Sequence, residues 1–108
     1  MELGIEVVHH GDVPVVKVAG ELDMSTAPDL SDVLDGLVAE PKVVVDLAEL
    51  EFIDSTGLSA LLGAHRAMQA RGGVLELRSP QPMVVSVVET TGLDAVFEIK
   101  LSDGPAGA

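Results

Sequence analysis

The amino-acid sequence predicts a single α/β domain: a mixed, mostly parallel sheet of four to five strands with about three to four helices. The run Val43–Leu47 is nearly all apolar and rich in β-branched residues, which is typical of a strand buried on both faces. Helix-like and strand-like segments then alternate along the chain. This alternation indicates parallel strands joined by right-handed helical crossovers. A chain of 108 residues forms one domain that buries about two-thirds of its unfolded surface.

The N-terminal segment predicts an antiparallel hairpin. Leu3, Ile5 and Val7 alternate with polar residues or glycine, the period-two pattern of a half-exposed strand. A turn signal follows at residues 10–12, and residues 13–19 form a second apolar run. Two such runs separated by a short turn predict neighbouring antiparallel strands.

The first helix is expected after residues 20–23, which we interpret as leaving the second strand. Ser25 or Thr26 offers an N-cap, and Pro28 suits the first helical turn. An apolar stripe at helical spacing follows, made of Leu30, Val33, Leu34, Leu37 and Val38. The pattern predicts an amphipathic helix that ends near Pro41.

The second half of the chain predicts the remaining elements in order. A central helix begins near residue 55 and ends at Gly72-Gly73, with these residues on one face: Leu58, Leu61, Leu62, His65 and Met68. A strand covers residues 74–77. A third helix opens at Ser79-Pro80 and closes at Gly92, with Met83, Val84, Val87 and Val88 facing inward. Residues 95–99 form a last edge strand, and the domain spans 1–100 with a flexible tail at 101–108.

The composition excludes several classes of function. A net charge of −12 and only two aromatic residues argue against nucleic-acid binding and against an anionic membrane surface. The absence of cysteine excludes disulfides and thiolate chemistry. No apolar run resembles a signal peptide or a membrane span, so we expect a soluble, cytoplasmic protein. Between residues 21 and 54 the acidic residues far outnumber Lys42, which fits either a contact surface for a basic protein or a solvated acidic face.

The residue pattern predicts no enzyme, no metal site and no cofactor. Ser55 is a nucleophile only with a base within hydrogen-bond reach, and His65 lies about 15 Å away along the helix axis. Asp54 is adjacent in sequence, and neighbouring residues of a helix point apart, so an N-cap or partner contact suits it better. His9 and His10 alternate across a strand and cannot converge on one ion.

The segment Asp54-Ser55-Thr56-Gly57 has two interpretations. Serine, threonine and aspartate before an apolar run are expected as simple helix caps. The same helix N-terminus also has unpaired amides and a positive dipole, so Ser55 could carry a phosphate covalently. Gly57 favours a functional site, because glycine is costly in a first helical turn unless something approaches the backbone closely.

Two motifs carry a resemblance to a known family: Gly20-Glu21-Leu22-Asp23 followed by Ser25-Thr26-Ala27-Pro28, and Phe52-Ile53-Asp54-Ser55-Thr56-Gly57-Leu58. The chain resembles the anti-sigma factor antagonists of the STAS domain family from about Leu3 to Ile99. The resemblance implies an anti-sigma factor with serine kinase activity as the partner. It also implies that this kinase phosphorylates Ser55 to switch binding off and that a phosphoserine phosphatase restores it. The partner-facing residues would be Asp23, Asp54, Ser55, Thr56 and Gly57.

The sequence alone leaves two other functions open. Family members often have glycine where this chain has Ser59, a departure that leaves the implied phosphorylation site intact. Transporter-linked members often lack the serine that matches Ser55, so its presence favours the regulatory branch. A scaffold or transport-complex subunit without a phosphorylation switch is the main alternative, and an autonomous hydrolase is another. We expect a monomer or a weak dimer.

Overall fold

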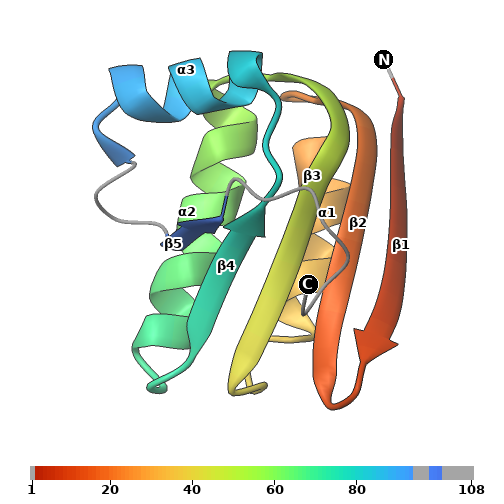
Figure 1. Ribbon diagram of the computed structural model, residues 1–108, viewed down its shortest axis with the longest axis vertical. Coiled ribbons are helices and arrows are strands. Elements are labelled where there is room, and N and C mark those ends of the chain that lie inside the picture. The colour runs from red at the N-terminus through yellow and green to blue at the C-terminus, as the bar shows by residue number, and fades with distance from the viewer. Residues whose placement is uncertain (1, 94–97, 101–108) are drawn as a thin grey trace.

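The computed structural model describes residues 2–93 and 98–100, and its elements follow the predicted order. The strands are β1 (Leu3–His10), β2 (Val13–Leu22), β3 (Lys42–Ile53), β4 (Val74–Arg78) and β5 (Glu98–Lys100). The helices are α1 (Ala27–Asp35), α2 (Ser55–Gln69) and α3 (Pro82–Thr90). They form one α/β unit (Figure 1).

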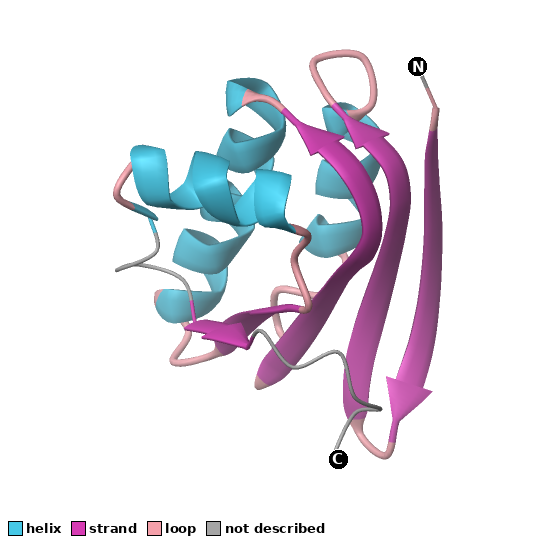
Figure 2. Ribbon diagram, turned by 45° about the horizontal axis from the view of Figure 1, so that its top comes forward, coloured by secondary structure: helices cyan, strands magenta, loops and turns pink. Residues whose placement is uncertain are grey.

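The sheet has the order β1-β2-β3-β4-β5, in which β1 pairs antiparallel with β2 and every later pair is parallel. The predicted hairpin and mostly parallel sheet are therefore confirmed. Figures 1 and 2 show α1 and α2 side by side on one face of this sheet, with α3 lying across the end where β3 leads into α2. The core lies between sheet and helices and includes the fully buried Leu22, Leu50, Ile53 and Leu61.

Strands β2 and β3 are longer than predicted. Residues 20–22 do not leave the sheet, because Leu22 pairs with Ile53 and both side chains are buried. The pairing shifts register near Gly20, whose φ of +105° suits glycine. A Cβ on Gly20 would lie 2.5 Å from the carbonyl oxygen of Glu2, so the N-terminal segment passes close by. In β3, exposed glutamates alternate with the buried Leu50, which extends the strand well past Leu47.

Helix α1 ends at Asp35 rather than near Pro41. The amides of Gly36 and Leu37 both donate to the carbonyl oxygen of Leu34, so tighter turns replace the helical ladder. Leu37 and Val38 still pack against the core. The apolar stripe therefore continues beyond the end of the helix, which is why the sequence predicted a longer helix.

Helix α3 begins at Pro82 rather than at Ser79-Pro80. Ser79 has a left-handed φ of 56°, which turns the chain after β4, and Pro82 has the fixed φ that suits a first helical position. Val84 and Val88 are buried as predicted, whereas Met83 is exposed. The prediction that Met83 faces inward is wrong: its side chain is exposed, whereas that of Val84 in the same first turn is buried.

The predicted edge strand is present as Glu98–Lys100 beside β4, and its residues 95–97 lie outside the described residues. The predicted tail, 101–108, also lies outside them. Among the helices of the described chain, none has the length and apolarity needed to cross a membrane.

Candidate functional site

The carboxyl ends of β2 and β3 meet at one end of the sheet, and α1 and α2 both begin there (Figure 1). The turn 23–26 joins β2 to α1, while the single residue Asp54 joins β3 to α2. The amide of Asp54 donates a 3.1 Å hydrogen bond to the carbonyl oxygen of Leu22, which ties the two connections together. We call residues 23–26 and 54–57 the carboxyl-end surface.

Asp54 is the N-cap of α2. Its backbone is extended, and its Oδ1 accepts a 2.9 Å hydrogen bond from the amide of Gly57. This is the capping geometry that the sequence predicted for a polar residue before the apolar run. The cap fixes where the helix begins, so Ser55 and Thr56 occupy its first two positions.

Ser55 and Thr56 are both exposed, so the two hydroxyls lie at the surface of the helix N-terminus. Backbone amides of a first helical turn have no partner within the helix, and the positive end of the dipole lies there. The Ser55 position therefore combines an accessible hydroxyl with an environment that accepts added negative charge.

Gly57 is buried, and the close approach that the sequence anticipated comes from the chain itself. A Cβ on Gly57 would lie 2.6 Å from Leu22 Cγ, 2.7 Å from the carbonyl oxygen of Leu22 and 3.2 Å from Ile53 Cγ1. Glycine at this position lets the first turn of α2 pack directly on the end of β2. Internal packing therefore accounts for Gly57, and this residue does not by itself indicate a partner.

Asp23 is also largely internal, with 8% of its surface exposed. Its Oδ1 accepts hydrogen bonds from the Ser25 hydroxyl at 2.7 Å, the Ser25 amide at 2.9 Å and the Thr26 amide at 3.2 Å. The Ser25 hydroxyl is the main reason that the pKa of Asp23 lies below its ordinary value. The carboxylate shapes the turn and stays ionised at neutral pH.

Thr26 closes the same turn from the other side. Its hydroxyl donates to the carbonyl oxygen of Glu21 at 2.8 Å and accepts from the amide of Asp23 at 2.9 Å. Thr26 is the N-cap residue of α1 by position, as the sequence allowed, although its hydroxyl does not bond to the helix amides. Its hydrogen bonds instead hold the turn to the end of β2.

Met24 is the residue of this surface that sequence reasoning missed. Its side chain is 74% exposed, while its neighbours Asp23 and Thr26 are buried. The signal in the sequence was a lone large apolar residue within an otherwise polar turn. Only the structure shows that the turn directs the Met24 side chain into solvent.

The three histidines do not assemble with Ser55. His65 is 9% exposed and lies along α2, well beyond its first turns, whereas His9 and His10 are exposed at the distal end of the β1–β2 hairpin. Within the described ranges, no group of histidine, aspartate and glutamate side chains could hold a metal ion.

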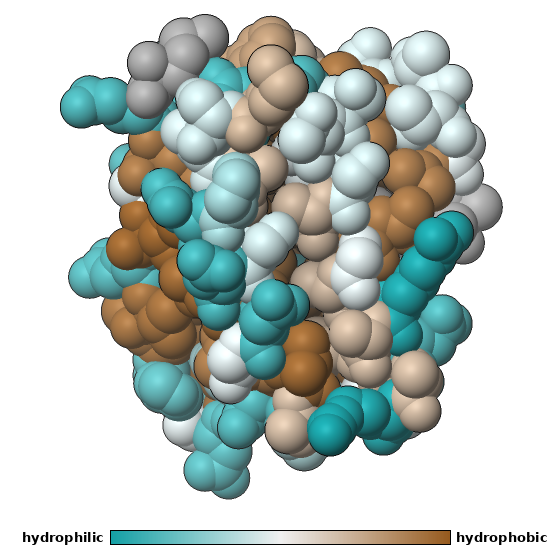
Figure 3. Space-filling view, turned by 180° about the vertical axis from the view of Figure 1, so that it is seen from behind, coloured by the Kyte–Doolittle hydropathy of each residue, from teal (hydrophilic) through white to brown (hydrophobic). Residues whose placement is uncertain are grey.

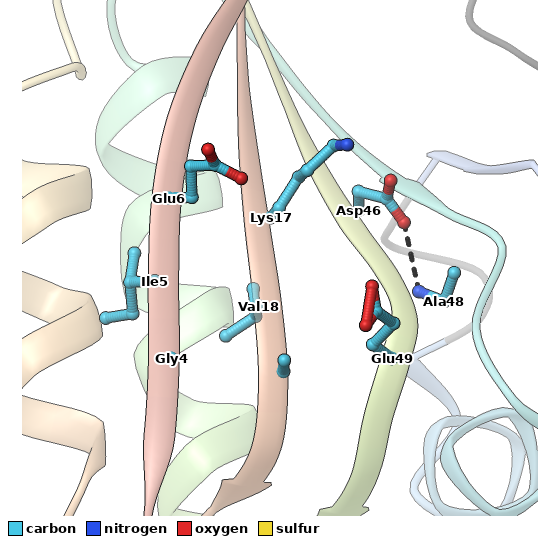
Figure 4. Close-up of a pocket in the computed structure, with 9 residues that line it drawn as sticks. Gly4, Ile5, Glu6, Lys17, Val18, Asp46, Ala48 and Glu49 are labelled. Carbon is cyan, nitrogen blue, oxygen red and sulfur yellow. Dashed lines mark hydrogen bonds between the residues drawn. The ribbon is translucent and has the colours of Figure 1, made fainter.

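A separate hollow of about 370 Å³ lies over strands β1, β2 and β3 (Figure 4). Lys17 lies opposite Glu6 on one neighbouring strand and opposite Asp46 on the other, and Glu49 adds a further carboxylate. The residues that line it come from the middle of the strands, away from Ser55. Seen from behind relative to the view of Figure 1, the surface is a mixture of hydrophilic side chains and separate hydrophobic patches (Figure 3).

The chain matches the model of the STAS domain over residues 4–106. It therefore belongs to the STAS domain family. Curated relatives include an anti-sigma F factor antagonist of Paenibacillus polymyxa, 30% identical over 102 residues that cover 92% of this chain and 87% of the relative. An anti-sigma-B factor antagonist of Listeria monocytogenes is 35% identical over 89 residues, covering 81% of this chain and 78% of the relative.

Solved structures agree with this assignment. An anti-sigma factor antagonist from Mycobacterium paratuberculosis superposes with a TM-score of 0.85 at 32% identity, covering 94% of this chain and 88% of the other. The phosphorylated form of the Bacillus cell fate determinant SpoIIAA has a TM-score of 0.71 at 21% identity, covering 89% and 90%, which shows the shared fold. The relatives are named as antagonists and not as enzymes.

Proposed function

We propose that this protein is an anti-sigma factor antagonist that binds an anti-sigma factor with serine kinase activity through the carboxyl-end surface. Binding frees the sigma factor, phosphorylation of Ser55 ends binding, and a phosphoserine phosphatase restores it. The observation that carries the proposal is the exposed hydroxyl of Ser55 at the capped N-terminus of α2. The names and near full-length coverage of the relatives support the class of partner.

The site tolerates the modification within the chain. A phosphate adds about −1.5 to −2 charge, and the helix dipole at Ser55 offsets part of the repulsion by about 0.3 to 2 kcal/mol. Ser55 is exposed, so the phosphate replaces no core packing. The fold therefore remains the same when Ser55 is phosphorylated.

The same charge is unfavourable at the interface. The carboxylates of Asp54 and Asp23 already make this end of the molecule negative, and a nucleotide-bound kinase brings further phosphate groups. Two like charges about 4 Å apart repel by about 4 kcal/mol at an effective dielectric constant of about 20. A loss of that size weakens binding several-hundred-fold, so one covalent group acts as a switch.

Intact-mass measurement tests the proposal after incubation with ATP and the anti-sigma factor kinase that binds the chain. The wild-type chain is expected to gain the mass of one phosphate group, and Ser55→Ala is expected to gain none. Thr56→Ala is the matched control, because it removes the neighbouring exposed hydroxyl and leaves Ser55 in place. A wild-type chain that binds the kinase and gains no phosphate contradicts the switch and favours a scaffold.

A further inference from the structure

The turn between β2 and α1 projects one apolar side chain into solvent. Met24 is 74% exposed, the largest value among the exposed large hydrophobic residues of the described chain. Its neighbours on either side take part in the turn, since Asp23 and Ser25 are joined by the 2.7 Å hydrogen bond. Exposing a methionine at a loop tip gains nothing for the fold, because its apolar surface stays in contact with water.

The backbone that carries Met24 is held by several hydrogen bonds within the turn. Asp23 Oδ1 accepts from both Ser25 and Thr26, and the amides of Thr26 and Ala27 donate to the carbonyl oxygen of Asp23 at 3.2 Å and 2.8 Å. The hydroxyl of Thr26 holds the turn to Glu21. A partner that binds Met24 therefore orders little beyond one flexible side chain, which lowers the entropic cost of association.

The turn that carries Met24 is joined to the connection that carries the proposed phosphorylation site. The hydrogen bond between Leu22 and Asp54 joins the two connections. Met24 follows Leu22 by two residues, and Ser55 follows Asp54 directly. At about 3.5 Å per residue, both side chains fall within a patch that one protein can cover. The charges around it are acidic, with Asp29 exposed in the first turn of α1 and Asp54 half-buried.

We infer that Met24 is the apolar anchor of the interface and inserts into an apolar pocket of the anti-sigma factor that is rimmed by basic side chains. The inference rests on the proposed function and assigns different roles to neighbouring residues. Asp23 positions the turn, Met24 supplies the apolar contact, and Ser55 supplies the switch. Methionine is enriched in protein interfaces relative to the rest of the surface, and the side chains that dominate binding energy are seated in desolvated pockets surrounded by other contacts that exclude water.

The test compares affinities for the purified anti-sigma factor that the wild-type chain binds. Met24→Ala and Met24→Gln, the second of which keeps the length and removes the apolar character, are both expected to bind about ten- to a hundred-fold more weakly. Met24→Leu is expected to bind nearly as well as wild type, because it conserves apolar volume. Val74→Ala is the matched control, since it shortens an exposed apolar side chain at the opposite end of the sheet.

Melting temperatures of the Met24 variants are expected to equal that of wild type, because the side chain is exposed. If Ser55→Asp loses binding while Met24→Ala and Met24→Gln bind as tightly as wild type, the inference is wrong and the proposed function stands. An equal loss for Val74→Ala also overturns the inference. A wild-type chain that binds no anti-sigma factor overturns the proposed function, and the inference with it.

Discussion

At the scale of single residues, Gly57 determines how closely the first turn of α2 packs on β2. Its missing side chain is what allows Leu22 to contact the helix backbone, and Leu22 in turn accepts the hydrogen bond from Asp54. The position of Ser55 thus depends on a contact between two residues more than thirty positions apart in the sequence. A change at Gly57 should disturb the surface and the fold together.

Gly57→Ala is expected to lower the free energy of unfolding by about 1–3 kcal/mol, because the added Cβ overlaps with Leu22. Gly63→Ala, in the same helix, is the control. Nothing lies within 4 Å of a Cβ at Gly63, so alanine there should stabilise the chain by about 0.5–1 kcal/mol. Denaturant unfolding of both variants measures the difference, and equal effects would contradict the packing account.

Residue types predicted the helix cap at Asp54 and the exposed hydroxyl at Ser55, because capping is local. They predicted a close approach to the backbone of Gly57 but not that Leu22 makes it, and they did not predict that Asp23 is buried. The burial of Asp23 results from a turn that folds back on itself, and that of Gly57 results from contact with a distant strand. The contact between Gly57 and Leu22 joins distant segments, and such a contact leaves no periodic pattern in the sequence.

At the scale of elements, α3 depends on tertiary packing more than the other helices do. It is rich in β-branched valines, which are poor helix formers. Val84 and Val88 are buried on the core, and its contact with β3 places it across the end of the sheet. Helix α3 therefore forms because the face that carries Val84 and Val88 is covered by the core.

Val88→Ala is expected to destabilise the chain by about 2 kcal/mol, from lost burial and the cavity left behind. Ser86→Ala on the exposed side of α3 is expected to be neutral or slightly stabilising, since alanine is the better helix former. Thermal unfolding followed by circular dichroism compares them. A Val88→Ala variant as stable as Ser86→Ala would show that packing does not hold this helix.

The order and type of the elements followed from the sequence, whereas several ends did not. The apolar stripe continued through Leu37 and Val38 after α1 had ended, because those residues remain in contact with the core. Conversely, β3 extended through charged residues because only one side of its second half is buried. Apolar periodicity reports burial, and burial does not stop where a helix or strand stops.

At the scale of the whole molecule, an ion-pair cluster around the buried Glu76 links β3 to β4. Glu76 is fully buried and contacts Lys42 Nζ at 3.0 Å and an Arg78 guanidinium nitrogen at 2.8 Å. Burial alone would raise the pKa of Glu76, but the two basic side chains outweigh it and hold the pKa below its ordinary value. The cluster is stabilising only while Glu76 is ionised.

The pKa of Glu76 is lower in the folded chain than its ordinary value of 4.5. The ionised Glu76 therefore contributes its full share to the free energy of unfolding above pH 4.5, and this contribution is lost as the pH falls through the pKa of the folded state. Glu76→Gln should be less stable than wild type at neutral pH and lose less on acidification. Urea unfolding across this pH range measures both, with the exposed Glu6→Gln as the control. Asp23, whose pKa is also lowered, keeps some acid sensitivity in every variant. If Glu76→Gln and wild type lose equal stability in acid, the cluster is not the cause.

The affinity of the chain for its anti-sigma factor, compared between wild type and Ser55→Asp, tests the central claim most directly. The Ser55→Asp variant is expected to bind up to several-hundred-fold more weakly than wild type. Its melting temperature is expected to stay nearly the same, because the added charge is exposed and the helix N-terminus accommodates it. Ser55→Ala, which adds no charge, should bind as wild type does. Equal affinity of Ser55→Asp and wild type would contradict the account.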